Sequence, residues 1–272
     1  MKLHSKLLAS LTATAGLLYG FAGPAQAAAI HDAGLFTTVL PANDDGSTGL
    51  VALGFNINFF SAMFSSLYVN NNGNTTFTAP LATFTPFPLL STATPILAPF
   101  FADVDTRGAG SGLVQYGQAT LGGRNVFGVN YINVGYFASH VNKLNSFQMI
   151  LTDRSDTGAG NFDFQFNYDQ IQWETGDASG GTNGLGGSSA RMGYSNGIAT
   201  AFEQPGSAIN GAFLDSNLAL GLIHNRRLSS VDGQYNFQVR NGQVITIPEP
   251  GSLALIGLGL VGLGLSRRRK IR

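Results

Sequence analysis

The sequence predicts an all-β protein with a single antiparallel β-sandwich-like domain. Short apolar and aromatic runs are separated at close intervals by glycine, asparagine, serine and threonine, as is typical of strands joined by turns. Residues 162–168 alternate aromatic and polar side chains, which indicates a strand with one buried face. Apart from two terminal segments, no helical period continues over three turns.

The candidate strands follow one another along the chain and are punctuated by turn residues. They cover residues 50–60, 66–69, 75–78, 97–101, 113–116, 125–132, 146–151, 162–168, 190–193, 219–223 and 234–239. The glycine- and serine-rich stretch 175–189 is too poor in apolar groups to pack, so we expect a solvated, mobile loop there. Such a loop could also carry a binding surface.

The N-terminus has the pattern of a secretory signal peptide. Lys2 and Lys6 precede an apolar run over 7–21, and Ala25 and Ala27 form a small-residue cleavage site. We therefore expect export through the Sec machinery, removal of residues 1–27 and a mature β domain over 28–247, with its core at about 50–240. Cysteine is absent, so disulfides contribute nothing to this exported domain.

The charge of the mature domain excludes one class of partner. The whole chain has a formal net charge of zero, but residues 28–247 hold eight Lys/Arg and fourteen Asp/Glu, which gives −6. Nucleic-acid binding depends on clustered basic side chains that neutralise phosphates. A nucleic-acid partner is therefore not expected.

The C-terminal segment 248–272 has the features of a membrane-directed tail. Pro248-Glu249-Pro250 precedes an uncharged stretch over 253–265 that includes four glycines, and a basic cluster follows. As a helix this stretch would be about 20 Å long, shorter than the hydrocarbon core of about 30 Å. We expect transient insertion into the inner membrane, with the basic cluster on the cytoplasmic side.

This tail resembles the PEP-CTERM sorting signal of Gram-negative bacteria. The resemblance implies recognition by an exosortase, removal of the tail, and delivery to the cell surface, the outer membrane or the extracellular polysaccharide. An ordinary tail anchor is the alternative. The residues that carry the resemblance are Pro248, Glu249, Pro250, Arg267, Arg268 and Arg269.

Four segments in order are similar to the nidogen-like domain of extracellular matrix proteins. They are 67–77 with its Asn72-Gly73 turn, 98–116, 145–174 with the only tryptophan, and 190–197. The resemblance implies a non-enzymatic role in cell-matrix adhesion or biofilm association, with extracellular polysaccharide or a matrix protein as partner. Because the chain lacks cysteine-rich modules, the resemblance implies only the class of activity, matrix adhesion, and does not identify a ligand.

Asp103 and Asp105 form a candidate metal site. Alternate residues of a strand point to the same side, so both carboxylates could converge on one calcium ion. Two carboxylates are few for such a site, and Arg107 could neutralise one of them in a structural ion pair, which is the interpretation we favour. A catalytic pair is the third alternative, and no other cofactor is expected.

The alternative function is a secreted carbohydrate-active enzyme or serine hydrolase on the same export route. Residues 193–197 match the G-x-S-x-G string around Ser195, and Asp215 and His224 follow in the order of a hydrolase fold. A nucleophile elbow requires a helix after the serine, and Pro205 closes off the short segment that follows. His31, His140 and His224 are too far apart in sequence to form a metalloenzyme motif. We therefore expect no enzymatic activity.

Overall fold

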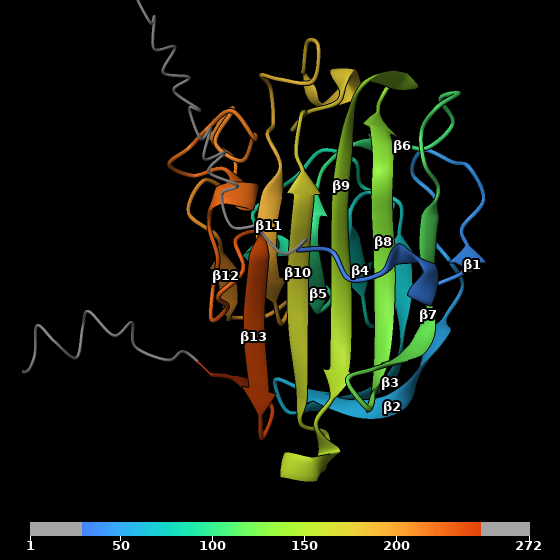
Figure 1. Cartoon of the computed structure of the whole chain (residues 1–272), viewed down its shortest axis with the longest axis vertical. Coiled ribbons are helices and arrows are strands. Elements are labelled where there is room, and N and C mark those ends of the chain that lie inside the picture. Colours follow the sequence, from blue (N-terminus) through green and yellow to red (C-terminus); the bar gives the residue numbers. More distant parts are fainter. Residues whose placement is uncertain (1–28, 246–272) are drawn as a thin grey trace, which may run out of the picture.

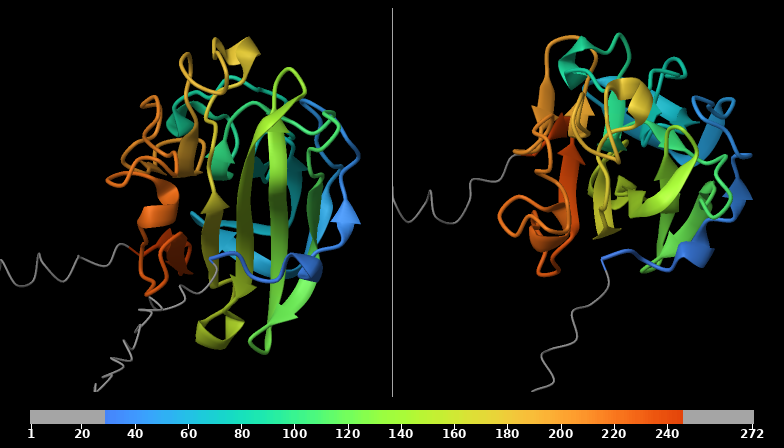
Figure 2. Two further views of the ribbon diagram at one scale, coloured as in Figure 1. Left: turned by 45° about the horizontal axis from the view of Figure 1, so that its top comes forward. Right: turned by 90° about the horizontal axis from the view of Figure 1, so that it is seen from above.

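The computed structural model describes residues 29–245. Their strands form two antiparallel sheets that face each other across a shared core, with the larger sheet in front in Figure 1 and the smaller one behind it. Figure 2 shows the same two layers from two further directions. The predicted all-β, antiparallel architecture is therefore confirmed.

The larger sheet has eight strands in the order β1-β7-β8-β9-β10-β13-β14, and β6 pairs with β8 beside this path. The long hairpin of β8 and β9 forms its centre. The strand bounds are Thr38–Val39 (β1), Val104–Asp105 (β6), Val114–Leu121 (β7), Arg124–Tyr136 (β8), His140–Asp153 (β9), Phe162–Gln170 (β10), Gln234–Arg240 (β13) and Gln243–Val244 (β14).

The smaller sheet has six strands in the order β12-β11-β5-β4-β3-β2. Their bounds are Val51–Phe59 (β2), Ala62–Asn70 (β3), Asn74–Thr76 (β4), Ile96–Phe101 (β5), Arg191–Ser195 (β11) and Ala201–Glu203 (β12). The described helices are single 3₁₀ turns at Ala33–Leu35 (η1), Leu89–Ser91 (η2), Ser155–Thr157 (η3), Asp177–Ser179 (η4) and Leu222–His224 (η5). Within 29–245 no helix has the length and apolar character needed to cross a membrane, and the expected helix 253–265 lies outside the described residues.

Aromatic side chains dominate the core between the sheets. The predicted alternation is confirmed over the first five residues of β10, since Phe162, Phe164 and Phe166 are buried while the side chains of Asp163 and Gln165 are only partly covered. It ends at Asn167, which is buried as well. The ring of Phe164 stacks on that of Phe237 in β13, with ring centroids 4.6 Å apart. Burial of one such side chain contributes about 1.5 to 3 kcal/mol, so a core of this kind can hold together a domain without disulfides.

The buried tryptophan connects this core to one end of the larger sheet. Trp173 is fully buried, and its indole Nε1 donates a hydrogen bond to the carbonyl oxygen of Val134 at 3.1 Å. Its ring lies edge-on to Phe100 of β5 at 5.7 Å and tilted against Tyr136 of β8 at 5.4 Å. The side chain therefore contacts strands of both sheets.

One predicted strand is wrong, and four strands were not predicted. Residues 219–223 form turns and part of η5, because the Asn217 side chain accepts hydrogen bonds from the backbone N–H groups of Ala219 and Leu220 and thereby closes a local turn. The unpredicted strands β1, β6, β12 and β14 have two or three residues each, too few to show a period in the sequence.

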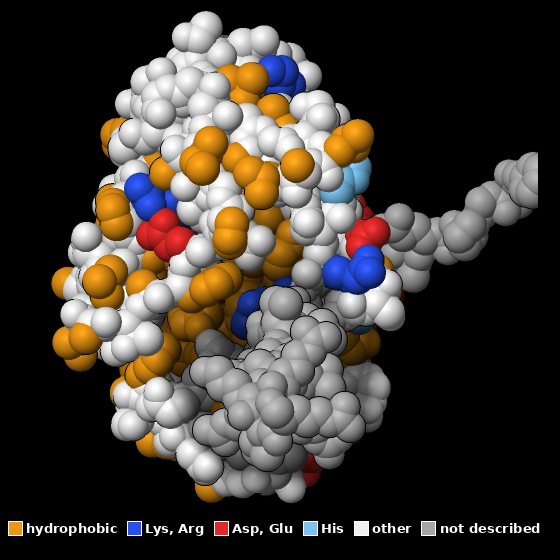
Figure 3. Space-filling view, turned by 90° about the vertical axis from the view of Figure 1, so that its left-hand side faces the viewer, with side chains coloured by type: hydrophobic (Ala, Val, Ile, Leu, Met, Phe, Trp, Pro, Cys, Tyr) orange, Lys and Arg blue, Asp and Glu red, His pale blue; other side chains and the backbone are white. Residues whose placement is uncertain are grey.

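Half of the large exposed apolar side chains lie in one stretch of the chain, which connects β11 to β13. Five of the ten large exposed hydrophobic residues lie there: Ile198, Ile209, Leu218, Leu220 and Leu228. Figure 3 shows that hydrophobic side chains on the face beside β12 and β13 are distributed among polar ones. Singly exposed apolar side chains are normal on protein surfaces and do not by themselves indicate a binding site.

Gly73 closes the turn between β3 and β4 where no other residue fits. Its φ angle is +70°, and a Cβ atom built on it would lie 1.8 Å from the carbonyl oxygen of Phe100 in β5. The sequence predicts positive φ at both Asn72 and Gly73, but among the three loop residues 71–73 only Gly73 has it, so the turn is one residue longer than expected. The missing side chain lets the turn pair closely with β5.

We expect Gly73→Ala to lower the free energy of unfolding by about 2 to 5 kcal/mol, because the new Cβ adds a steric clash to the strain of a left-handed backbone. Gly122→Ala is the matched control: Gly122 has a φ of +57° and nothing within 4 Å of a built Cβ. This variant should lower the free energy of unfolding only by the backbone strain, about 1 to 2 kcal/mol. Urea denaturation of both variants checks this, and equal losses would contradict the close approach to Phe100.

Candidate functional site

Polar and charged segments meet at one end of the sandwich, at the top of the larger sheet in Figure 1. The backbone N–H of Asp177 in η4 donates to the carbonyl of Phe137 in the β8–β9 turn at 3.0 Å. The N–H of Phe137 donates in turn to the carbonyl of Asp103 at 3.2 Å, and the N–H of Thr106 donates to the carbonyl of Asn43 at 2.9 Å. These bonds hold the turn, η4 and the loop 41–47 together around an acidic cluster and a polar pocket.

The acidic cluster consists of Asp44, Asp45 and Asp103. One carboxylate oxygen from each lies within 4.8 Å of those from the other two. Asp103 is only 1% exposed, and its Oδ2 atom lies 3.5 Å from the Ser179 hydroxyl. The Oδ1 atoms of Asp44 and Asp103 are buried and have no hydrogen-bond partner.

Two asparagines of the β3–β4 turn position this cluster. The amide nitrogen of Asn71 donates to the carbonyl oxygens of Asp44 at 2.5 Å and Val104 at 2.6 Å. The amide of Asn72 donates to Asp45 Oδ1 at 2.9 Å, while its oxygen accepts from the Val104 N–H at 3.0 Å. The loop with Asp44 and Asp45 is thereby fixed beside Asp103.

Burial and mutual repulsion disfavour the charged form of the cluster. Burial, followed by the charges of Asp44 and Asp45, raises the pKa of Asp103 to about 7. Burial, followed by the charges of Asp105 and Asp45, raises the pKa of Asp44 to about 6. Two unit charges within 4.8 Å of each other repel by at least about 3.5 kcal/mol at an effective dielectric constant of 20. Near neutral pH the three carboxylates therefore need a cation or bound protons to offset their negative charge.

Asp105 lies in a different environment from Asp103. Its Oδ1 accepts hydrogen bonds from the backbone N–H and Nε of Arg107, and its Oδ2 accepts from Arg107 Nη2 at 2.7 Å and from the Ser139 N–H at 2.8 Å. Although burial opposes it, these bonds lower the pKa of Asp105 below its usual value. The predicted ion pair with Arg107 is confirmed, whereas the predicted convergence of both carboxylates is wrong for Asp105. The reason is that β6 begins only at Val104, so strand alternation does not extend to Asp103.

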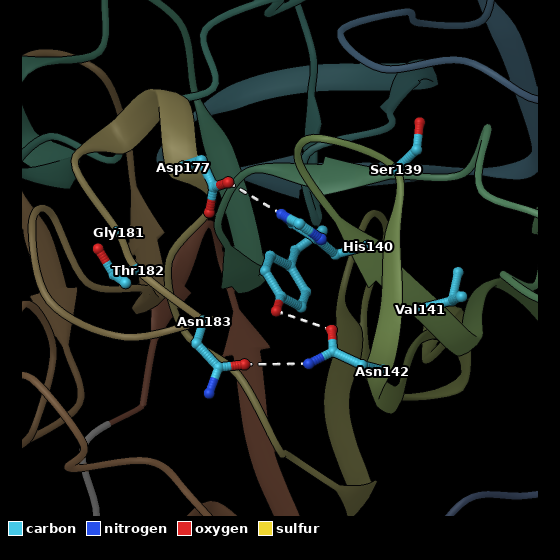
Figure 4. A pocket seen from close by; sticks show the side chains of 9 residues that line it. Ser139, His140, Val141, Asn142, Asp177, Gly181, Thr182 and Asn183 are labelled. Carbon is cyan, nitrogen blue, oxygen red and sulfur yellow. Dashed lines mark hydrogen bonds and ion pairs between the residues drawn. The ribbon is translucent and has the colours of Figure 1, made fainter.

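The polar pocket lies next to the cluster and has a volume of about 490 Å³. It is lined by Tyr136, Ser139, His140, Val141, Asn142, Asp177, Gly181, Thr182 and Asn183. In Figure 4 His140 faces Asp177, and Asn142 faces Asn183 across the pocket. His140 Nε2 lies 2.9 Å from Asp177 Oδ2, and the Asn142 amide donates to Asn183 Oδ1 at 3.0 Å.

One wall of the pocket comes from the stretch 175–189, which was expected to be a solvated excursion. The stretch is solvated only in part: Asp177, Ala178, Thr182 and Asn183 are exposed, whereas Thr175, Ser179 and Ser189 are buried. Backbone hydrogen bonds replace the missing apolar contacts: the N–H groups of Glu174 and Thr175 both donate to the carbonyl of Gly184. The loop is therefore folded back on itself and against the β8–β9 turn.

The residues of the hydrolase alternative do not form a nucleophile elbow. Ser195 is fully buried at the end of β11, and its hydroxyl oxygen accepts a hydrogen bond from the Gly197 N–H. The chain then turns into strand β12, so the helix that an elbow requires is replaced by a hairpin. His224 Nε2 lies 2.7 Å from the carbonyl oxygen of Asp215, whose carboxylate accepts from the Ile171 N–H.

Several predicted functional residues lie outside the described range 29–245. They are the signal-cleavage residues Ala25 and Ala27 and the sorting residues Pro248, Glu249, Pro250, Arg267, Arg268 and Arg269. Conversely, the sequence did not single out Asp44 or Asp45. Of the pocket it indicated only the loop 175–189 as a possible binding surface, and it considered His140 only as part of a metalloenzyme motif, which it excluded. The doublet Asp44-Asp45 in a turn-like Asn-Asp-Asp-Gly segment was the available signal, but nothing in it indicates contact with Asp103.

Two family models match the chain. A model described as a nidogen-like domain matches residues 65–241, and a model described as the PEP-CTERM protein-sorting motif matches residues 246–270. Both predicted resemblances are therefore confirmed. The first match covers most of the described residues, including Asp103 and the pocket, while Asp44 and Asp45 precede it.

Similar proteins include alpha-tectorin and nidogen-2. Alpha-tectorin of Homo sapiens is 35% identical over 196 residues, which cover 62% of this chain and 9% of that protein. Alpha-tectorin of Gallus gallus is 34% identical over 198 residues, and nidogen-2 of Mus musculus is 35% identical over 99 residues, with 9% and 7% of those proteins covered. The chain thus spans about a tenth of the length of these relatives. No solved structure shows significant similarity to it.

The raised pKa of Asp103 predicts a pH dependence of stability in the presence of a metal chelator. The carboxyl group of Asp103 keeps its proton in the folded state up to about pH 7, whereas in the unfolded state it releases the proton near pH 4. Protonation of Asp103 therefore stabilises the fold fully below about pH 4, and this stabilisation is lost as the pH rises to about 7. We expect the free energy of unfolding of the wild type to fall relative to Asp103→Asn by up to about 4 kcal/mol over this range. The other charges facing Asp103, on Asp44, Asp45, Asp105 and Arg107, remain in both proteins.

Urea denaturation of both proteins at about pH 4 and about pH 8 measures this difference. Since Asn cannot ionise, only the wild type has the contribution of residue 103 to the pH dependence. If the free energies of unfolding of the wild type and of Asp103→Asn change in parallel with pH, the pKa of Asp103 is not raised and the cluster does not need an additional positive charge.

Proposed function

Because the chain belongs to the nidogen-like domain family and carries a PEP-CTERM sorting motif behind that domain, we propose that it is a non-enzymatic adhesion protein of the extracellular matrix. The two matches place an extracellular class of domain and a sorting motif on one chain, which supports an exported protein recognised by an exosortase. The proposal adds that the domain acts by binding extracellular polymer at the surface of a Gram-negative cell, as in a biofilm.

The observation that carries this proposal is the order of the two matches. The domain match ends at residue 241 and the sorting match begins at residue 246, and the last described strand, β14, ends at Val244. Sec export followed by exosortase processing would therefore leave the binding domain outside the inner membrane. In this proposal the tail 253–265 inserts only transiently.

The polar pocket is our candidate ligand site, with extracellular polysaccharide as the ligand class. Its rim presents an imidazole, a carboxylate and two amides, from His140, Asp177, Asn142 and Asn183. Such groups donate and accept hydrogen bonds with sugar hydroxyls. A matrix protein is the second ligand class that the domain family suggests.

The pocket can be tested with residues 28–247 on an array of glycans and matrix proteins. We expect binding to acidic or neutral polysaccharide, and a His140→Ala/Asn183→Ala double variant should bind at least about tenfold more weakly because it loses two polar groups of the rim. Gln238→Ala in β13, which lines a different depression, is the control and should bind as the wild type does.

Other outcomes of this array would contradict parts of the proposal. Equal binding by the double variant and the control would exclude the pocket as the ligand site. Binding to matrix proteins alone would show that the ligand is a protein and not a polysaccharide. Catalytic turnover of a bound glycan would favour the alternative, a secreted carbohydrate-active enzyme.

Sorting can be tested in a host with the matching exosortase. The mature protein should lack residues 253–272, and Glu249→Ala should retain them because the Pro-Glu-Pro recognition element is altered. Intact-mass measurement distinguishes the two forms. Recovery of native protein that still ends at Arg272 would instead indicate a plain membrane anchor.

A further inference from the structure

The acidic cluster contains carboxylate oxygens that the protein itself leaves without partners. Asp103 is 99% buried, and its Oδ1 atom has no hydrogen-bond donor, as is also true of the buried Oδ1 of Asp44. Unpaired buried acceptors are rare in folded proteins because their desolvation is not compensated. Both groups belong to the same cluster, so a single ligand could satisfy them together.

The charge around the cluster also lacks compensation. Among the described residues, the one ion pair to the cluster joins Arg107 Nη2 and Asp44 Oδ2 at 3.0 Å. The same guanidinium group makes two hydrogen bonds to Asp105, so one positive charge faces four carboxylates. A bound cation would supply the positive charge that the cluster lacks.

The donor set selects the class of cation. All three side chains offer oxygen, and no histidine or cysteine belongs to the cluster. Hard cations such as Ca²⁺ prefer carboxylate oxygen, whereas Zn²⁺ and Cu²⁺ favour nitrogen and sulfur ligands. Ca²⁺ tolerates irregular geometry and completes its shell with water and carbonyl oxygens, which suits three ligands from two separate chain segments.

The cluster is also held in place before any ion binds. The Asn71 amide bridges the carbonyls of Asp44 and Val104, and the Asn72 amide orients the Asp45 carboxylate. Asp103 is fixed from the other side, since a Cβ on Gly176 would lie only 2.4 Å from its Oδ2 atom. Asp44 and Asp45 are partly exposed, which gives an ion access from solvent.

We propose that Asp44, Asp45 and Asp103 bind one calcium ion, which ties the loop 41–47 to the segment leading into β6. Asp105 is not a ligand, because Arg107 and Ser139 already occupy both of its oxygens. This site is independent of the proposed adhesion function. It stabilises the end of the sandwich that also carries the polar pocket.

The test uses the exported protein, first stripped of metal with EDTA and then titrated with CaCl₂ alone. We expect a single binding event by calorimetry and, at a hundredfold excess over Kd, a melting temperature about 5 to 10 °C higher. Asp103→Asn should weaken calcium binding at least about tenfold and lose this rise. Asp45→Asn, at the exposed side of the cluster, should also weaken calcium binding and reduce the rise in melting temperature. It replaces Asp103→Asn in the test if that variant does not fold.

Asp153→Asn is the matched control, because it removes one carboxylate at the far end of β9, where the Asp153 side chain accepts hydrogen bonds from Ser155. It should retain both the affinity and the thermal shift. The proposal fails if calcium and EDTA give the same melting curve and no heat of binding is detected. It also fails if Asp103→Asn and Asp45→Asn bind calcium as tightly as Asp153→Asn does.

Discussion

The buried asparagines of the β3–β4 turn are the constraint on which the rest of the structure depends. Asn70, Asn71, Asn72 and Asn74 are almost completely inaccessible to solvent. A buried amide must find partners for its donors and acceptors, and here those partners come from distant segments. Asn70 accepts from the Ser47 hydroxyl at 2.7 Å, and its backbone carbonyl accepts from the Tyr131 hydroxyl of the larger sheet at 2.7 Å. One turn thereby connects both sheets with the loop 41–47.

The same turn explains how the segments at the polar end of the molecule are held together without disulfides. Asn71 and Asn72 supply hydrogen bonds to the loop of Asp44 and Asp45, while Gly73 lets β5 approach closely enough to place Asp103 beside them. Nearly every polar group in this network is satisfied, so the unpaired oxygens of the cluster stand out against it. The amides of this network have hydrogen-bond partners. Two carboxylate oxygens of the cluster lack partners until a cation or a proton binds.

The sequence predicts the fold better than it predicts the site, and the reason is physical. Burial of one sheet face produces a local period, so β10 and β13 are found at nearly their observed bounds. Strands of two or three residues have no period, and the turn at Asn217 depends on one side chain. Asp103 was identified as a candidate, but its partners Asp44 and Asp45 lie about sixty residues earlier in the chain and are brought near it by tertiary hydrogen bonds that leave no local pattern.

The two ends of the sandwich have different roles in the proposed function. The β13–β14 turn lies beside the β2–β3 turn, since the Phe60 N–H donates to the carbonyl of Gly242 at 2.7 Å. This is the end at which β9 finishes, whereas His140 begins β9 beside the pocket. Fourteen residues of strand separate the two ends by about 40 Å. A chain held through the residues that follow β14 therefore presents its pocket and acidic cluster away from the attachment, as binding to polymer outside the cell requires.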